Sequence, residues 1–257
     1  MKIRTLIENT TCRPDLTPEH GLSLYIETGE HRILFDAGQS DAFADNAEKL
    51  GIDLSSVDLA ILSHGHYDHG GGLCRFLEIN STAPIYLSRY AFEPHYNGSG
   101  KFIGLPPELA KSRRLIFTEE RVELAPGITL DPGGKCVHPI DPFGLTTREG
   151  VPEDFRHEQH LLIEEDGRRV LFSGCSHKGI LNIVDWFRPD VLIGGFHFKQ
   201  LDPMLDADRL AEAAHRLLEY PTTYYTGHCT GQAQFAFLKR WMGGRLHALS
   251  TGSEIEL

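Results

Sequence analysis

Short apolar runs separated by turn residues organise the first part of the chain. Two such runs, residues 21–27 and 31–36, flank a short turn and predict a β-hairpin. Apolar residues then repeat at helical spacing over residues 41–50, which predicts a helix. The other elements expected here are strands at 1–7, 57–63, 84–88, 113–119, 121–127 and 128–134 and a helix at 72–80.

The second part repeats this order, with a hairpin first and β–α alternation afterwards. Residues 158–174 predict the hairpin, with its turn at Glu165–Gly167. The amphipathic pattern of residues 206–220 is the clearest helical signal of the chain. The other elements expected here are a helix at 175–187, a strand at 189–198, a strand, loop and helix within 221–243, and one or two short strands at the end.

Two long stretches, residues 89–109 and 131–157, are rich in Gly and Pro and have no regular period. Irregular loops of this length in a compact domain usually have a function, such as covering a substrate. Neither a repeat nor a linker interrupts the chain, so we expect a single domain over residues 1–257. Hairpins followed by β–α alternation in both halves favour two mixed β-sheets flanked by helices, an α+β architecture.

Composition narrows the classes of partner and the cellular compartment. The formal net charge of -11 disfavours a nucleic-acid partner, which requires a basic surface. No apolar run approaches the roughly 20 residues that span a bilayer, and the first residues lack the apolar core of a signal peptide. The five cysteines form no CxxC pair, which favours free thiols in a reducing compartment. We therefore expect a cytoplasmic protein without a membrane or nucleic-acid partner, and the sequence does not indicate its oligomeric state.

The most informative stretch is SHGHYDHGGG, which follows an expected strand and precedes an expected helix. Its potential ligands are His64, His66, Asp68 and His69. Imidazole and carboxylate groups suit zinc, or iron or manganese, and their density indicates two divalent ions. His64 and His66, two residues apart, can reach one ion, whereas Asp68 and His69 can reach a second. The alternative, a surface loop that is merely rich in histidine, is disfavoured by the strand before it and the helix after it.

The stretch SHGHYDHGGGL resembles the HxHxDH signature of the metallo-β-lactamase superfamily. GLSLYIE–HRILFDAG, VLFSG and TGHCTG are similar to its opening hairpin, its strand before a bridging aspartate, and its last histidine motif. The resemblance implies an αββα sandwich of two mixed sheets with helices outside and metals at one edge. It also implies His228 as the final ligand of the second ion, alongside Asp68 and His69. The alternative is that His228 is a buried histidine hydrogen-bonded in a loop.

Two features depart from the superfamily pattern. The segment that usually supplies the third histidine of the first ion is missing, and Cys175 stands where the bridging aspartate is expected. We expect His177, two residues further on, to be the third ligand of the first ion. His138, His157 and His160 are the alternatives. Cys175 is either a thiolate ligand or a small buried residue at the end of a strand.

The segments GCSH, GGFH, GHCTG and IGLP resemble one branch of the superfamily. That branch is named for 7,8-dihydropterin-6-yl-methyl-4-(β-D-ribofuranosyl)aminobenzene 5′-phosphate synthase, which joins a dihydropterin diphosphate to an aminobenzene ribose phosphate. Our leading expectation is a hydrolase in which two ions activate water against a phosphorylated or acyl small molecule. The alternatives are a dihydropterin diphosphate transferase and a metal-binding module without catalysis.

Several further residues have expected roles around the metals. We expect His197 to bind an anionic substrate or to act as a general acid, and the alternative is a core histidine at the end of a strand. Asp68 and His197 are the expected catalytic residues. We expect Asp36 to orient a ligand histidine without touching metal. The candidate phosphate ligands of the first long loop, which an exposed charged loop explains equally well, are Arg89, His95 and Lys101.

Overall fold

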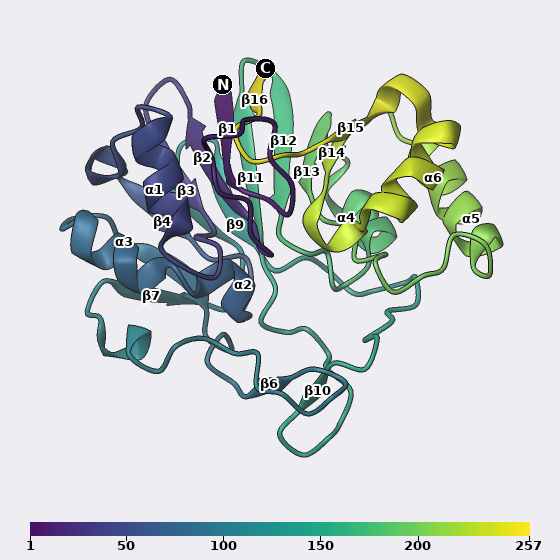
Figure 1. Cartoon of the computed structure of the whole chain (residues 1–257), viewed down its shortest axis with the longest axis horizontal. Coiled ribbons are helices and arrows are strands. Elements are labelled where there is room, and N and C mark those ends of the chain that lie inside the picture. The colour runs from purple at the N-terminus through teal and green to yellow at the C-terminus, as the bar shows by residue number, and fades with distance from the viewer. The chain divides into compact units, whose positions relative to one another are not determined.

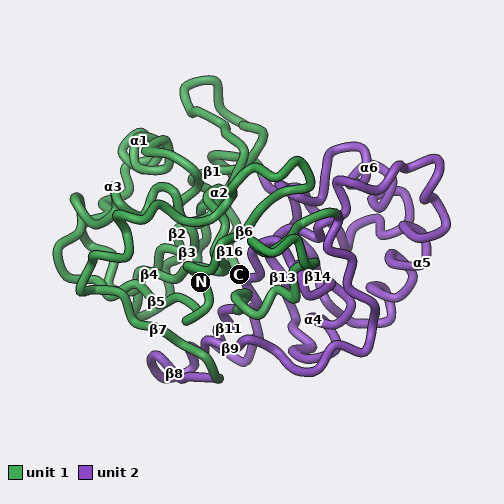
Figure 2. Tube along the Cα trace, turned by 90° about the horizontal axis from the view of Figure 1, so that it is seen from below, with its two compact units in different colours: residues 1–120, 144–159, 250–257 green, residues 121–143, 160–249 purple.

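The computed structural model describes all 257 residues (Figure 1), and the chain divides into two compact units (Figure 2). Unit 1 comprises residues 1–120, 144–159 and 250–257, and unit 2 comprises residues 121–143 and 160–249. Each unit contains one seven-stranded mixed sheet with its own helices. The expected α+β class with two mixed sheets and flanking helices is therefore confirmed, whereas the single domain stays a prediction.

The sheet of unit 1 is antiparallel on one side and parallel on the other. Strands β16, β1, β2 and β3 pair antiparallel, and strands β3, β4, β5 and β7 pair parallel. Carboxyl ends of parallel strands share one edge of a sheet, so the loops that leave these strands are brought together. In spatial order the strands are β16 (Glu254–Glu256), β1 (Lys2–Ile7), β2 (Ser23–Glu27), β3 (Arg32–Phe35), β4 (Leu59–Ile61), β5 (Ile85–Ser88) and β7 (Leu115–Thr118).

The helices of unit 1 are α1 (Ala42–Lys49), α2 (Tyr67–Gly70) and α3 (Leu73–Ile79). Phe43 of α1 and Phe76 of α3 are completely buried in one cluster with Leu34, Ala60 and Ile85 of the central strands. Figure 1 shows α1 and α3 beside β3 and β4, as this cluster requires. The helices cover the sheet because their apolar faces meet every second residue of each strand.

The sheet of unit 2 has the same division. Strands β8, β9, β11 and β12 pair antiparallel, and β12, β13, β14 and β15 pair parallel. In spatial order the strands are β15 (Leu246–Ala248), β14 (Thr223–Thr226), β13 (Val191–Gly194), β12 (Arg168–Ser173), β11 (His160–Glu165), β9 (Ile128–Asp131) and β8 (Val122–Ala125).

The helices of unit 2 are α4 (Ile180–Phe187), α5 (Ala207–Leu218) and α6 (Gln232–Met242). Ile183, Leu210 and Leu238, one from each helix, are completely buried in a cluster with Leu192 and Tyr224 of the parallel strands. The clear amphipathic pattern of α5 thus corresponds to a helix that packs on the sheet. None of the helices in the structure is both long and apolar enough to cross a membrane.

The two stretches predicted to be irregular contain only a short ribbon, in which β6 (His95–Tyr96) pairs with β10 (Thr146–Thr147). This pairing joins residues 144–159 to the long loop after β5 within unit 1. Because His95 stands opposite Thr147, the ribbon brings polar residues of both loops together.

Three predicted boundaries differ from the structure near the expected site. The helix predicted from residue 175 begins only at Ile180, because Ser176 and Gly179 have positive φ angles that a helix does not contain. The strand predicted to reach 198 ends at Gly194, where a side chain would collide with the carbonyl oxygen of Ser173. The metal motif, expected between a strand and a helix, itself contains the one-turn helix α2 (Tyr67–Gly70), for which we predicted no element.

Candidate metal centre

Asp36 anchors the metal motif of unit 1 to the sheet. It follows β3 directly and is completely buried, and Ser63 follows the neighbouring parallel strand β4. The backbone N–H of Ser63 donates to Oδ1 of Asp36 over 2.7 Å, and the hydroxyl of Ser63 donates to Oδ2 over 2.7 Å. Nδ1 of His69 lies 2.6 Å from the same Oδ2. The structure thus contains a contact between Asp36 and a histidine of the motif, and the role of that histidine as a metal ligand stays a prediction.

This network assigns the protons of two imidazoles. The hydroxyl proton of Ser63 goes to Asp36, so Nδ1 of His64, 2.8 Å from that hydroxyl, must be the donor. Nδ1 of His69 likewise donates to the carboxylate. Both rings then carry the lone pair on Nε2, the state in which imidazole binds metal. The centroids of the two rings lie 4.1 Å apart.

Asp68 is held from the N-terminal segment. Its Oδ2 lies 3.2 Å from Nε2 of His20, and its backbone oxygen accepts a hydrogen bond from the N–H of Leu22. Gly21 makes this approach possible, because a Cβ there would lie 2.5 Å from that same oxygen. His20 is thus a neighbour of the motif that sequence reasoning missed.

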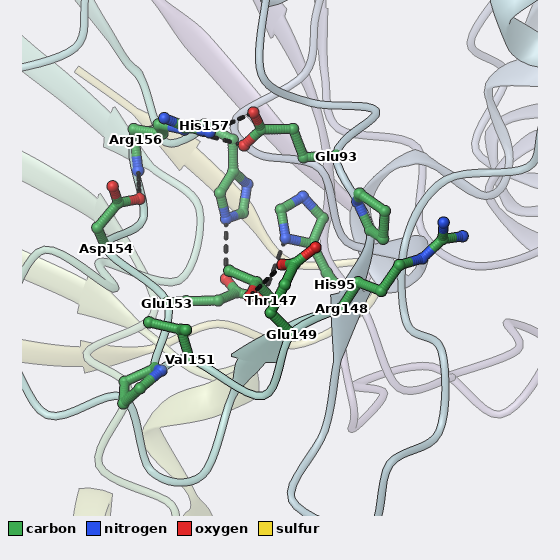
Figure 3. A pocket seen from close by; sticks show the side chains of 12 residues that line it. Glu93, His95, Thr147, Arg148, Glu149, Val151, Glu153, Asp154, Arg156 and His157 are labelled. Atoms are coloured by element: carbon green, nitrogen blue, oxygen red, sulfur yellow. Dashed lines mark hydrogen bonds and ion pairs between the residues drawn. The ribbon is translucent and has the colours of Figure 1, made fainter.

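A second carboxylate, Glu153, faces three imidazoles of unit 1, and Figure 3 shows two of them, those of His95 and His157. Its Oε1 lies 3.0 Å from Nδ1 of His95, and its Oε2 lies 3.1 Å from Nε2 of His157. The same Oε2 is 3.6 Å from Nε2 of His66, an ion-pair contact beyond hydrogen-bonding length. Nδ1 of His157 accepts the backbone N–H of Gly65 over 2.9 Å. The metal motif is therefore tied to residues 144–159 through both a side chain and the backbone.

Burial keeps this cluster in a defined charge state. Desolvation lowers the pKa of His157 to about 3, although Glu153 opposes the shift. Burial also lowers the pKa of His66, again against the influence of Glu153. Burial alone would raise the pKa of Glu153, but His157, His66 and His95 hold it well below its usual range. At neutral pH Glu153 is therefore an ionised carboxylate that faces the neutral imidazoles of His66 and His157.

A pocket of about 400 Å³ opens beside this cluster (Figure 3). His95, Glu153 and His157 line it together with exposed charged residues, among them Arg148. Arg156 and Glu93 also line the pocket and form an ion pair with each other, and Arg156 stands over the ring of Tyr90. The pocket gives a small polar molecule access to the carboxylate–imidazole cluster.

In unit 2, the loops after three parallel strands supply the candidate ligands. Cys175 and His177 follow β12, His197 follows β13, and His228 follows β14. Backbone hydrogen bonds connect these loops, including Gly195 N–H to the oxygen of Gly174 over 2.8 Å. The loops meet because the carboxyl ends of the three strands lie at one edge of the sheet.

Two groups of potential ligands form within unit 2. The ligand atoms of Cys175, His177 and His197 lie within 4.8 Å of one another, and so do those of Cys175, His228 and Cys229. Burial would raise the pKa of the Cys229 thiol, but contacts with Cys175 and His197 hold it well below its usual range. Thiolate and imidazole donors fit a zinc-type divalent ion.

The structure gives other partners to several residues that we considered as ligands. His138 pairs with Asp185 over 2.8 Å, and Nδ1 of His160 lies 3.1 Å from the hydroxyl of Ser173. Both ring nitrogens of His157 have partners within unit 1. Binding of a metal ion by His157 would therefore cost it one of these two hydrogen bonds.

The other predicted residues are placed as follows. His64, His66, Asp68 and His69 are buried together in one motif of unit 1, and the rings of His177 and His197 lie 4.2 Å apart in unit 2. His197 stands three residues beyond the end of its strand, with φ at +56°, and not in the strand as we expected. Among the candidate phosphate ligands, Arg89 pairs with Glu119, Lys101 stands over the ring of Tyr67, and His95 is buried against Glu153. The metal-ligand roles stay predictions.

Comparison with known proteins identifies the class. The family model of the metallo-beta-lactamase superfamily matches residues 16–228, so the chain belongs to this superfamily.

Individual relatives agree with that class. The chain is 31% identical, over 96% of its length and 95% of the relative, to 7,8-dihydropterin-6-methyl-4-(beta-D-ribofuranosyl)-aminobenzene-5'-phosphate synthase of Methanocaldococcus jannaschii. It is also 29% identical to an uncharacterised protein of the same organism, over 76% of the chain and 78% of that protein. The expected resemblance to the superfamily and to this branch is confirmed.

Solved structures share the fold. The crystal structure of Tm1679, described as a metal-dependent hydrolase of the beta-lactamase superfamily, has a TM-score of 0.86 at 27% identity and covers 100% of this chain and 99% of its own. Zn(2+)-bound PqqB from Methylobacterium extorquens has a TM-score of 0.60 at 14% identity, with 100% of each chain covered, and supports the fold alone. The metallo-β-lactamase fold that the sequence predicts is thereby confirmed.

Proposed function

We propose that this chain is a metal-dependent hydrolase that uses two divalent ions, zinc foremost, against a small anionic molecule with a phosphoryl or acyl group. The observation that carries the proposal is the pair of buried imidazoles of His64 and His69, whose Nδ1 protons are committed to Ser63 and Asp36. Such a commitment leaves Nε2 of each ring in the metal-binding state. The proposed ligands are His64, His66, Asp68, His69, His177 and His228.

Divalent ions at these residues would supply Lewis acidity toward water and toward the phosphoryl or acyl oxygen of a substrate. The chain's own residues orient the imidazoles, as Asp36 does for His69. His197 follows β13 and is half-buried beside His177. We propose that His197 donates a proton to the leaving group or binds the anionic part of the substrate. We also propose a cytoplasmic location and no nucleic-acid or membrane partner, on the grounds of charge and hydropathy.

Metal content and hydrolysis test the proposal together. Protein expressed in metal-replete medium should contain about two equivalents of zinc, iron or manganese, and it should hydrolyse members of a panel of phosphodiesters, phosphomonoesters and lactones. Asp68→Ala should lower both metal content and turnover, whereas His215→Gln, at an exposed position of unit 2, should change neither. Less than one equivalent of metal would contradict the proposal.

The second candidate function is a synthase reaction. It is favoured by the 31% identity, over nearly the full length of both chains, to the Methanocaldococcus jannaschii synthase. Here the same ions would hold the diphosphate leaving group of a dihydropterin diphosphate. Incubation with that diphosphate and the aminobenzene ribose phosphate decides between the two reactions, since the hydrolase releases phosphate without forming a condensation product.

The third candidate is a metal-binding module without catalysis. It predicts that Asp68→Ala lowers metal affinity while parent and variant both stay at background in every hydrolysis and condensation assay.

A further inference from the structure

The cluster of His66, His95, Glu153 and His157 lies entirely within unit 1, and all four side chains are at least nine-tenths buried. One ligand atom from each residue lies within 4.8 Å of the others. That arrangement fits either a cation held by four ligands or a carboxylate that holds the protons of three imidazoles. The hydrogen bonds around His157 distinguish between the two.

Nδ1 of His157 accepts the backbone N–H of Gly65 over 2.9 Å. A nitrogen that accepts an N–H carries no proton of its own, so the ring proton of neutral His157 is on Nε2. Nε2 of His157 therefore donates to Oε2 of Glu153, 3.1 Å away. A cation at the centre of the cluster would force that proton onto Nδ1, opposite the N–H of Gly65. The network thus fits protons and not a cation.

The other imidazoles meet the same carboxylate. Nδ1 of His95 is 3.0 Å from Oε1, so the carboxylate favours the proton of His95 on Nδ1. Nε2 of His66 is 3.6 Å from Oε2. An ionised carboxylate facing Nε2 of His66 favours the proton on that nitrogen, which leaves the lone pair on Nδ1.

We propose that Glu153 is a positioning residue of the metal motif, which sets the proton of His66 on Nε2 and so presents Nδ1 of His66 as the metal-binding nitrogen. The inference deepens the proposed function, because it takes His66 to be a metal ligand. His157 completes the arrangement by tying Glu153 to the backbone of Gly65, between the first two histidines of the motif. A Cβ at residue 65 would lie 2.2 Å from the oxygen of Ala91, so the backbone at this position has little freedom to shift.

Glu153→Gln tests the role without a change in side-chain size. The carboxylate accepts from His95 and His157 and attracts the N–H of His66 over 3.6 Å, whereas glutamine offers one oxygen and an NH₂ group that would face an imidazole N–H. At least one ring must then move its proton or turn. The matched control is Glu149→Gln, an exposed carboxylate of the same pocket that accepts from the hydroxyl of Thr147.

The first measurement needs no metal. In metal-free protein labelled with ¹⁵N-histidine, two-bond ¹H–¹⁵N spectra report which ring nitrogen carries each proton. We expect Nε2–H for His66 and His157 and Nδ1–H for His95 in the parent and in Glu149→Gln, with at least one of these assignments changed in Glu153→Gln. An Nδ1–H tautomer of His66 in the parent would overturn the inference.

The second measurement is zinc affinity, by competition with a chromophoric chelator. Removal of a carboxylate that orients a metal-binding histidine typically weakens binding about 10–100-fold, and we expect this for Glu153→Gln but not for Glu149→Gln. If Glu153→Gln does not fold, His157→Asn takes its place, because its amide oxygen can still accept from Gly65 while the donor to Glu153 is lost. It should weaken zinc binding less than tenfold.

The outcomes separate the two proposals. A parent that binds no zinc but has the expected tautomers contradicts the proposed function and leaves Glu153 as the residue that sets the proton of His66. A parent that binds zinc, with Glu153→Gln binding it equally tightly, overturns the positioning role while the proposed function stands. An additional equivalent of zinc in the parent that Glu153→Gln alone removes would show that the cluster is itself a metal site, which also overturns the inference.

Discussion

Asp36 and Glu153 are both buried carboxylates of unit 1 that accept protons from imidazoles of the metal motif or beside it. Asp36 accepts a hydrogen bond from Nδ1–H of His69 directly. Nδ1–H of His64 donates to the hydroxyl of Ser63, which in turn donates to Asp36. Glu153 instead faces Nε2 of His66. The two carboxylates therefore act on opposite nitrogens, although His66 stands only two residues after His64 and three residues before His69.

The difference between the two anchors shows how one short motif can present different ring nitrogens. His64 and His66 are nearly adjacent in sequence, but their rings meet almost at right angles, with centroids 4.7 Å apart. The carboxylate behind each ring determines which nitrogen keeps the lone pair. Ligand geometry in this motif thus depends on residues outside it as much as on the motif itself.

The largest effect is expected from Asp36→Asn. Asparagine tolerates the left-handed φ of +57° at this position, so the backbone should not confound the result. Its amide group would face N–H and O–H donors in a fully buried site, which should lower the free energy of unfolding of the metal-free protein by about 3 kcal/mol.

Urea denaturation measures this loss, and the exposed Asp58, which accepts from the backbone N–H of Arg32, provides the control. Asp58→Asn should cost about 1 kcal/mol or less. A greater loss from Glu153→Gln than from Asp36→Asn would reverse our ranking of the two anchors.

An intermediate effect is expected from the pH dependence that His157 contributes. Its folded pKa of about 3 lies below the reference value of 6.5, so the unfolded chain binds a proton that the folded protein does not. The free energy of unfolding then falls as the pH falls from about 7 toward 3. His157 should account for about 2 kcal/mol of the loss between pH 7 and pH 5. His157→Asn should make the decline shallower by this amount.

Unfolding free energies of the metal-free protein at several pH values test this prediction. His215→Asn, at an exposed position of unit 2, serves as the control. A slope for His157→Asn as steep as that of the parent would mean that Glu153 does not hold a neutral imidazole there.

The smallest effect is expected from Ser63→Ala, which removes the hydroxyl between Asp36 and His64 but leaves His69 on the carboxylate. The loss in unfolding free energy should be about 1 kcal/mol, and zinc affinity should fall less than tenfold. The control is Ser99→Ala, which removes an exposed hydroxyl bonded to Asn97. If Ser63→Ala equals Asp36→Asn in both measurements, the direct bond to His69 contributes nothing by itself.

Much of the fold, and the part of the site around Asp36, could be predicted from the pattern of apolar and turn residues in the sequence. Strong periodicity predicted α5, and turn residues between apolar runs predicted the β2–β3 hairpin. Asp36 could be proposed as an orienting residue because it ends a strand beside the motif. Its contact with His69 depends on parallel pairing of β3 and β4, which buried apolar runs indicate.

Glu153 could not be found in this way. It lies in a stretch without periodicity, and its contacts with His66 and His95 depend on the β6–β10 ribbon, whose strands are two residues long. The late start of α4 was hidden for a related reason. Ser176 has a positive φ although nothing about serine requires it, so tertiary contacts and not local preference determine the turn that contains His177.

The carboxylate–imidazole cluster has a consequence for how this protein can change over generations. Each proton in the cluster has one acceptor, so replacing His95, His157 or Glu153 alone leaves a buried donor or acceptor unmatched. Variation at these positions should therefore be epistatic: a lineage that loses the glutamate should also have replaced at least one of its histidine partners, and single exchanges should be rare among functional descendants.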